Sequence, residues 1–470
     1  MNNIHLTRGA NPGAVCDFIN SCYDSGTNLH SFQYVKGGRV VAKVALSPYS
    51  FIEKMLVYSL SKSFTSACVG VAQSEGILNI DERIVDIFPD KCPDIISENL
   101  SEMRIKDCLC MTSGHSACVF EHLQNQKDPV RYFLSQPLDY RPGTTFVYST
   151  AATFICGAAV TKRSGMNLLD YLYEKVLKKM DLEKPEWRSC PDGSKFGGTG
   201  LVISGDSITE FGKMICNGGV YKGKKIIPEE WIKTASSIHS VTPKNGTADW
   251  TAGYGYQFWL NARGGFRGDG AYGQLCMIFP ERDIVFTVLS ESINMQKEVD
   301  CVYRLLDEID KPDDGRIEEL KTLVQTLYLP EKCKSDFKRV EYKPKKNIAG
   351  ISAIVLDPCD DGIVVSLECD YKTQKIQCGN GFYKKNQLLL KNLTPGIWTK
   401  FIEEKPREIN VYASYNDSSQ NEITVTLRHI DAPHTQVWHF PKKEDGDWYI
   451  TMHCGALNPQ IVKTPVIINR

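Results

Sequence analysis

The sequence has no surplus of charge of either sign and no long apolar run. Its 470 residues include 55 Lys and Arg against 56 Asp and Glu, so the formal net charge is -1. Because the basic and acidic residues are so nearly equal in number, the chain lacks the excess of positive charge that binds a nucleic acid or another polyanion. No apolar stretch approaches the roughly 18 residues that a membrane-spanning helix needs. We therefore expect neither a nucleic-acid partner nor a membrane partner.

The sequence also lacks a cysteine pattern typical of disulfides or of zinc. The 17 cysteines are odd in number and scattered singly through apolar stretches, which indicates buried thiols in a reducing compartment. Cys108 and Cys110 form a C-x-C pair, but no second Cys or His pair lies at zinc spacing. The first residues lack the charged segment and apolar stretch of a signal peptide. Together these absences predict a cytoplasmic protein with no metal and no other cofactor.

Length alone predicts roughly three domains, or equally two large ones, and the composition predicts a soluble globular protein. The chain is 42% hydrophobic and 24% charged, which is typical of globular proteins. Residues 1–312 mix helical and strand patterns, and residues 313–334 resemble a helical connector. Beyond the connector, short β-rich runs follow one another, for example at 423–427 and 436–440. The sequence therefore predicts a main domain over 1–312, a connector over 313–334 and a small β-rich accessory domain over 335–470.

The main domain is expected to have an α+β fold. Apolar residues at a 3.6-residue period predict helices over 14–24, 59–76, 151–162, 204–217 and 293–309. Strands are expected at 30–35, 39–46, 253–260, 271–279 and 283–290, with a tight turn at Lys36-Gly37-Gly38 between the first two. Because these strands come from both ends of the domain, they predict an antiparallel sheet flanked by helices. Residues 77–147, between the helices expected at 59–76 and 151–162, are a mixture of helix and loop.

The strongest chemical signal is Ser59-Leu60-Ser61-Lys62, an S-x-x-K motif. Residues three apart share one face of a helix, so the Ser59 hydroxyl and the Lys62 amine can meet. A serine hydroxyl is a weak nucleophile until a neighbouring base accepts its proton, and a desolvated lysine can share that task. The simple alternative for an isolated match is an N-capping serine beside a solvated lysine.

A longer stretch favours the catalytic interpretation. Residues 55–66, continuing through Glu75-Gly76 to Asp81, resemble the nucleophile helix of the serine β-lactamase and penicillin-binding-protein superfamily. The closest subgroup is class C-like and includes family VIII carboxylesterases and 6-aminohexanoate-dimer hydrolase. The resemblance implies a β-lactamase/transpeptidase-like fold, with an antiparallel sheet and a mainly helical subdomain, and it implies Ser59 as nucleophile.

A second motif supports the same resemblance. Residues 141–150, Arg-Pro-Gly-Thr-Thr-Phe-Val-Tyr-Ser-Thr, are similar to the family's tyrosine region. This implies that Tyr148 acts as general base together with Lys62, whose positive charge would lower the tyrosine's pKa. Thr150 replaces the family's usual Asn, and its hydroxyl can still hydrogen-bond the lysine or the substrate. The alternative for Tyr148 is a half-buried core aromatic.

The third family motif, K-T-G or H-x-G, is altered. Counting back from the turn at Phe279-Pro280 places it on Gly268-Asp269-Gly270, where the basic residue is missing. The backbone N–H of Ala271 would pair with that of Ser59 as an oxyanion hole, a role that does not depend on side-chain identity. Gly270 and Asp269 are therefore expected beside the substrate.

Two arginines could supply the missing charge at the third motif. The alternative register at Arg263-Gly264-Gly265 keeps a basic residue but leaves a long gap to the turn. Arg267 could compensate for the missing charge, although strand alternation points it away from position 268.

His115 follows Thr112-Ser113-Gly114 in a loop that borders the site in relatives. It is therefore a candidate substrate-side residue, although a lone histidine is more often a structural hydrogen-bonder.

The resemblance implies two-step acyl transfer without a metal or cofactor, on a small-molecule ester, amide or peptide substrate. Loss of the basic residue should weaken binding of the carboxylate that penicillins and D-Ala peptides carry. The alternatives are β-lactamase or D-Ala peptidase activity, or a catalytically weak binding or scaffold protein. The residues do not choose between ester and amide, and they leave the oligomeric state open.

Overall fold

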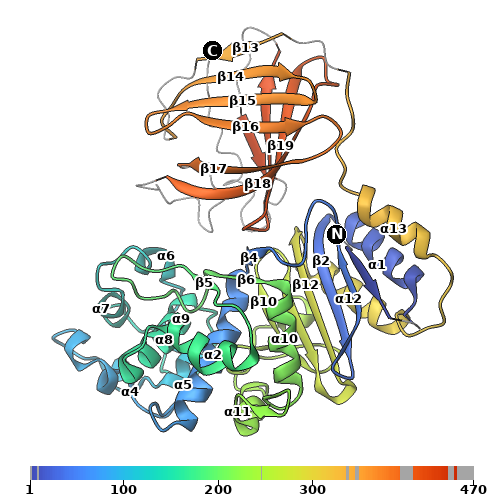
Figure 1. The fold of residues 1–470 in the computed structure, drawn as a ribbon. Coiled ribbons are helices and arrows are strands. Elements are labelled where there is room, and N and C mark those ends of the chain that lie inside the picture. The colour runs from blue at the N-terminus through green and yellow to red at the C-terminus, as the bar shows by residue number, and fades with distance from the viewer. Residues whose placement is uncertain are drawn as a thin grey trace.

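The computed structural model describes residues 3–7, 10–244, 246–334, 338–343, 349–391, 406–442 and 449–452. Parts of the predicted accessory domain, including 392–405 and 453–470, lie outside the described residues. Two large sheets dominate the fold, one from each end of the chain (Figure 1). In the described part of the chain, no helix combines the length and the apolar character that a membrane crossing needs.

The first sheet has seven strands, and all its neighbours are antiparallel, as predicted. Strands from both ends of the domain meet at its centre, where β12 pairs with β2. The β2–β3 hairpin turns through Gly37 and Gly38, which both have positive φ. In sheet order the strands are β1 (Ile4–Leu6), β3 (Arg39–Ala45), β2 (Thr27–Lys36), β12 (Ile284–Ser292), β11 (Gln274–Phe279), β10 (Phe266–Gly270) and β9 (Trp259–Leu260).

Helices cover both faces of this sheet (Figure 1). One face packs against three helices from the two ends of the domain, and Phe18 and Phe32 meet edge to face there at 5.1 Å. The other face packs against α2 and α10, whose Phe64 and Phe211 stack at 4.1 Å. The helices of the first face are α1 (Pro12–Asp24), α12 (Met295–Glu308) and α13 (Ile317–Thr326), and those of the second are α2 (Ser61–Ser74) and α10 (Gly205–Cys216).

A mainly helical part extends beyond α2, on the side away from β1 (Figure 1). Its central helix α8 (Thr150–Ser164) is buried against α2, and Gly165 ends it in the left-handed conformation. The short segments around it are α3 (Ile84–Ile87), α4 (Glu98–Glu102), α5 (Ile105–Leu109), α6 (Phe120–Leu123), α7 (Pro129–Leu134) and α9 (Leu168–Leu172). The short helix α11 (Glu229–Ala235) packs against α2 instead.

Two strand predictions need correction. Residues 253–258 run irregularly, and only Trp259–Leu260 of the expected strand 253–260 pair in the sheet. The expected strand 271–279 begins at Gln274, because residues 271–273 form the turn after a separate strand, β10. β10 contains four charged or glycine positions in a row, Arg267 to Gly270, so it has no apolar alternation to reveal it. Its charges are buried because they pair with each other.

The second sheet forms a β domain with its own core, centred on the fully buried Trp438. Its strands are mainly antiparallel, with β17 pairing off the main path onto β18. They are β13 (Val340–Tyr342), β14 (Ile351–Cys359), β15 (Gly362–Cys369), β16 (Gln374–Gly379), β17 (Lys384–Leu390), β18 (Arg407–Asn416), β19 (Glu422–His429), β20 (Thr435–Pro441) and β21 (Tyr449–Met452). A C-terminal β domain is thus confirmed, while the exact boundaries at 312 and 334 stay a prediction.

The β domain contacts the segment that leads to Ser59. The Tyr412 hydroxyl on β18 donates to Glu53 at 2.6 Å. The backbone N–H of Leu56, the last residue of β4 (Lys54–Leu56), donates to the Asp431 carbonyl at 3.0 Å. The other edge of β4 pairs with β6 (Leu201–Ser204), which in turn pairs with β5 (Glu186–Trp187). The β4 strand therefore lies between strand β6 of the main domain and the β19–β20 loop.

Candidate active site

Ser59 lies at the junction between β4 and α2. A 3-10 turn over Tyr58–Leu60 precedes α2, so Ser59 is presented one turn before the helix proper begins. Its side chain is half-buried, whereas Lys62 on the first turn of α2 is 2% exposed. The Lys62 Nζ donates to the Ser59 Oγ at 3.1 Å. The three-residue spacing thus brings nucleophile and amine into direct contact, as the motif predicts.

Two further oxygens hold the Lys62 amine. It donates to the Thr150 Oγ1 at 3.1 Å and to the Gly198 carbonyl at 2.7 Å. These partners are neutral, so they orient the amine without compensating a positive charge. Burial lowers the pKa of Lys62 to about 7, although the charge of Asp269 acts in the opposite direction. A large fraction of this lysine is therefore a neutral amine near pH 7, which can accept a proton.

Tyr148 completes the cluster around Ser59. Its ring lies 4.9 Å from the Lys62 Nζ, and the Ser59 side chain is close enough to act on the pKa of the Tyr148 phenol. The ring stacks on Trp259 at 5.5 Å. Burial and the nearby Asp269 carboxylate raise the pKa of Tyr148 above its ordinary value. The expected lowering of this pKa by Lys62 is therefore wrong, because the lysine is itself desolvated and lies over the ring face.

The residues predicted to form the oxyanion hole lie where β10 ends beside the turn of Ser59. Gly270 closes β10, and a Cβ at that position would lie 2.1 Å from the Val57 carbonyl. Only glycine permits this close approach of the two backbones. Ala271 follows, packed in one apolar cluster with Tyr58. Among the described residues, the backbone N–H groups of Ser59 and Ala271 donate to no backbone carbonyl.

Asp269 projects a carboxylate into this region, where the family motif has a threonine. It is 7% exposed, and its Oδ2 accepts from the Arg267 Nε at 3.1 Å. Burial raises the pKa of Asp269, and its charge acts on both Lys62 and Tyr148. Position 269 thus places a negative group near the nucleophile.

Arg267 is committed to a structural network. It is fully buried, and besides Asp269 it donates to the carbonyls of Leu260 and Asp249, each at 3.0 Å. Its guanidinium also lies 4.4 Å over the Trp250 ring. The suggestion that Arg267 replaces the missing basic residue is therefore not supported, because its donors are already occupied.

Gly268 explains why the basic residue is absent. A Cβ at this position would lie 2.5 Å from both Leu60 Cδ1 and Ser63 Oγ. Strand β10 packs so tightly against the start of α2 that a side chain here must displace a neighbour. The alternative register fails as well, since Arg263 pairs with Asp307 on α12, at 2.9 Å.

The structure does not bring His115 into the Ser59 cluster. Its described contacts are a hydrogen bond with Ser113 at 3.1 Å and ring packing on Phe133 at 4.5 Å. Burial lowers the pKa of His115 to about 4, so it is neutral at physiological pH. These contacts fit a structural histidine better than a substrate-binding one.

Sequence reasoning missed Cys118 at this site. Its sulfur accepts from the backbone N–H of Thr150 at 3.3 Å, and the Thr150 Oγ1 in turn accepts from the Lys62 Nζ. It is exposed, unlike most cysteines of the described chain. The only sequence signal was its position three residues after His115, which no motif marks.

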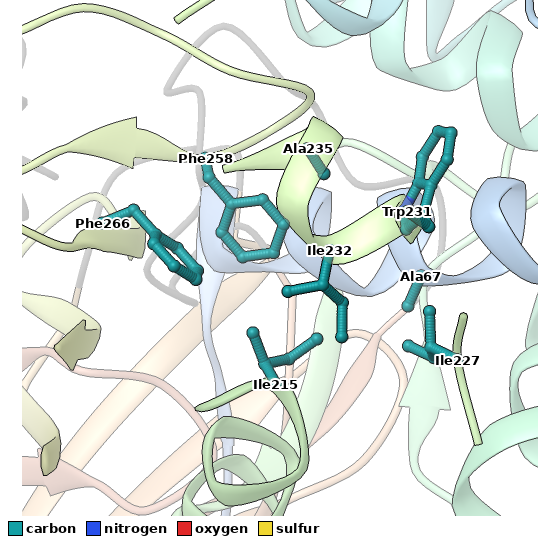
Figure 2. Close-up of a pocket in the computed structure, with 8 residues that line it drawn as sticks. All are labelled: Ala67, Ile215, Ile227, Trp231, Ile232, Ala235, Phe258 and Phe266. Atoms are coloured by element: carbon teal, nitrogen blue, oxygen red, sulfur yellow. The ribbon is translucent and has the colours of Figure 1, made fainter. Parts of the chain in front are cut away.

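The fold also contains a small apolar cavity that is separate from this cluster. Figure 2 shows the side chains that line it, among them Trp231, Phe258 and Phe266, facing one another. None of its lining residues carries a group that could act as nucleophile or base. The cavity is therefore a packing gap in the core, and the candidate site remains the Ser59 cluster.

Comparison with known proteins gives a consistent result. The family described as Beta-lactamase matches residues 30–306, more than half of the chain. A 6-aminohexanoate-dimer hydrolase of Paenarthrobacter ureafaciens is 22% identical over 285 residues, which cover 56% of this chain and 73% of the relative.

Two solved structures are similar in fold. One is a family VIII carboxylesterase, with a TM-score of 0.51 at 15% identity, covering 64% of this chain and 99% of that one. The other is the octameric penicillin-binding protein homologue from Pyrococcus abyssi, with a TM-score of 0.51 at 15% identity. It covers 88% of this chain and 97% of its own, so the likeness in fold extends into the C-terminal β domain.

Proposed function

This chain belongs to the beta-lactamase family, and we propose that it is a serine hydrolase that cleaves an ester or amide bond through an acyl-enzyme on Ser59. The observation that carries the proposal is the direct contact between the Ser59 Oγ and the buried Lys62 amine, at 3.1 Å. The relatives support the substrate class, since one is named a 6-aminohexanoate-dimer hydrolase and another a family VIII carboxylesterase.

The first step forms the acyl-enzyme. The neutral Lys62 amine takes the Ser59 proton while the Oγ attacks the substrate carbonyl carbon. The developing oxyanion is stabilised by the backbone N–H groups of Ser59 and Ala271. Tyr148, neutral because its pKa is raised, gives its proton to the leaving group and takes in return the proton that Lys62 holds, so that Lys62 is a neutral amine again before the second step.

The second step releases the acid. A water molecule attacks the acyl carbonyl, and Lys62 again accepts the proton, which is returned when the bond to Ser59 Oγ breaks. Ser59, Lys62 and Tyr148 are the only protein groups that give or take a proton in the two steps. No step requires a group that the chain does not carry.

Electrostatics favour substrates without a carboxylate near the reacting bond. The family motif offers a basic residue at position 268, but this chain offers Gly268 followed by the Asp269 carboxylate. A substrate carboxylate there would meet a like charge in a region of low dielectric. We therefore propose simple esters or amides as substrates in preference to β-lactams and D-Ala peptides.

The test compares a short-chain chromogenic ester, nitrocefin and a D-Ala-D-Ala peptide on the same protein. We expect ester cleavage with little nitrocefin turnover, together with labelling of Ser59 by a fluorophosphonate. Ser59→Ala should lower the ester rate by about 10⁴-fold or more, as expected for loss of a nucleophile. Ser74→Ala, an exposed change on the same helix, serves as the control and should be silent.

Either of two results would contradict the proposal. Rapid nitrocefin turnover would overturn the argument from positions 268 and 269 but leave the nucleophile in place. An unlabelled Ser59, with every activity unchanged in Ser59→Ala, would instead favour a binding or scaffold role on the same fold.

A further inference from the structure

We propose that the C-terminal β domain is part of the active site, because the β19–β20 loop uses His434 to hold the two tyrosines that flank the oxyanion-hole amides. The inference rests on the proposed function, and it assigns a role to a domain that carries no catalytic motif. His434 is a positioning residue, since it touches Tyr58 and Tyr272 rather than the reacting atoms.

The contacts of His434 define this arrangement. Its Nε2 hydrogen-bonds the Tyr58 hydroxyl, and its ring lies edge-on to the Tyr272 ring at 4.8 Å. Tyr58 and Tyr272 also contact each other, with ring centroids 5.2 Å apart. Tyr58 precedes Ser59 and Tyr272 follows Ala271 in the chain. One imidazole from the β domain thus contacts the neighbours of both oxyanion donors.

The backbone at these two tyrosines makes such support necessary. Tyr58 has a φ of 46° and Tyr272 a φ of 67°, both in the left-handed region that non-glycine residues seldom adopt. A side chain in that region costs free energy and persists only where the surroundings fix it. The Ser59 N–H belongs to the peptide unit that follows Tyr58, so its direction depends on the Tyr58 backbone angles, while the Ala271 N–H is held within the turn 271–273 that contains Tyr272. Fixing the two tyrosine side chains therefore helps to fix the direction of the Ser59 and Ala271 amides.

The loop that presents His434 is itself held on the main domain. Besides the bond from Leu56 to the Asp431 carbonyl, the Thr435 backbone N–H donates to the Glu291 Oε1 at 3.0 Å. Glu291 belongs to β12, and its carboxylate lies 3.9 Å from the His434 Nδ1. Ala432 packs in the same apolar cluster as Leu56 and Tyr58. The loop is thus attached on both sides of His434, which prevents the imidazole from moving independently of the site.

The contact between His434 and Tyr58 is buried, so solvent cannot replace either partner. His434 is 1% exposed and Tyr58 2% exposed. Burial also lowers the pKa of His434 to about 3, so the ring is neutral and its Nε2 can accept a hydrogen bond from the Tyr58 hydroxyl. A buried hydroxyl that loses its acceptor must find another or shift. Truncation of His434 should therefore release Tyr58 rather than leave it in place.

The test is His434→Ala in the full-length chain, with His439→Ala as matched control. His439 is the same residue type in the same sheet, and its Nδ1 hydrogen-bonds Glu422 within the β domain. We expect His434→Ala to lower kcat for the chromogenic ester by about 10- to 100-fold with little change in KM, because misdirected oxyanion donors weaken transition-state binding. Tyr58→Phe should lose a similar amount, and the double variant should lose no more than either single variant. His434→Gln should recover part of the rate.

Hydrogen exchange gives a readout that needs no turnover. Peptides covering 55–61 and 268–275 should exchange faster in His434→Ala than in His439→Ala. If the wild type neither cleaves the ester nor labels at Ser59, the proposed function fails. The exchange rates of the two peptides in His434→Ala then still decide whether His434 holds these segments in place. If an active enzyme keeps its kcat after His434→Ala, whether or not exchange rises, the inference is overturned. If kcat falls while exchange in both peptides is unchanged, positioning is overturned as the cause.

Discussion

A lysine with almost no water around it is the residue on which the proton transfers depend. Lys62 is 2% exposed, and burial lowers its pKa to about 7. The same burial raises the pKa of Tyr148, so the two groups differ in the direction in which the protein shifts them. Of the two, the lysine is the better base near neutral pH, because its neutral form is already populated.

The first prediction concerns the pH dependence of ester cleavage. Only the neutral amine can accept the Ser59 proton, so kcat/KM should rise with pH and level off above about 7. Below that value the protonated fraction grows, and the rate should fall about tenfold per pH unit. A pH–rate profile, with circular dichroism at each pH to verify folding, measures this. A flat profile between pH 5 and 8 would contradict the assignment of Lys62 as base.

At the scale of the element, strand β10 decides which substrates the site accepts. It approaches the start of α2 so closely that glycine is required at 268 and 270. Its two charged residues, Arg267 and Asp269, form an ion pair inside the protein. The strand therefore supplies a backbone surface and a carboxylate, but no positive charge, to the substrate side.

Gly268→Lys, which restores the family's basic residue, tests this view of β10. The new side chain meets Leu60 and Ser63, so we expect destabilisation of about 1–3 kcal/mol and no gain in nitrocefin turnover. Urea unfolding and nitrocefin assays measure the two effects. Ala262→Lys, an exposed addition of the same side chain just before β10, should leave stability unchanged. A stable Gly268→Lys variant that hydrolyses nitrocefin would show that the packing does yield.

The same strand shows where sequence reasoning reached its limit. Helices with a clear 3.6-residue period, such as α10 and α12, were predicted within a few residues, because periodicity reports the buried face directly. Strand β10 was not predicted as a separate strand, since glycines and paired charges replace its apolar positions. In the site, Ser59, Lys62 and Tyr148 stand in recognisable motifs. The contact of Tyr58 with His434 joins positions 376 residues apart, and no local pattern encodes it.

At the scale of the whole molecule, the two domains are joined by more than the loop at His434. Arg428 of β19 is 8% exposed, and its guanidinium lies 4.4 Å over the Tyr328 ring just after α13. Its Nε donates to the Tyr383 hydroxyl at 2.9 Å, while the Tyr328 hydroxyl accepts from the Leu29 backbone N–H. The arginine thus connects the β domain to the central sheet through one tyrosine.

Arg428→Ala should weaken that connection. A desolvated cation–π contact is worth about 2 kcal/mol, so we expect the β domain to unfold at lower temperature than the main domain. Differential scanning calorimetry should then resolve a second transition that the wild type lacks. Arg339→Ala, at an exposed arginine just before β13 of the same domain, is the matched control and should keep the wild-type profile. An unchanged profile in Arg428→Ala would show that the domains do not depend on this contact.

The order of the strands has a consequence for how the protein becomes active during its synthesis. The centre of the first sheet joins β2 to β12, and β12 is translated about 250 residues after β2. The nucleophile, amine and phenol have all left the ribosome before this pairing becomes available. His434 emerges still later, more than 100 residues after β12. A nascent chain that already contains every reacting side chain is therefore expected to stay inactive until β12 has paired and His434 has emerged.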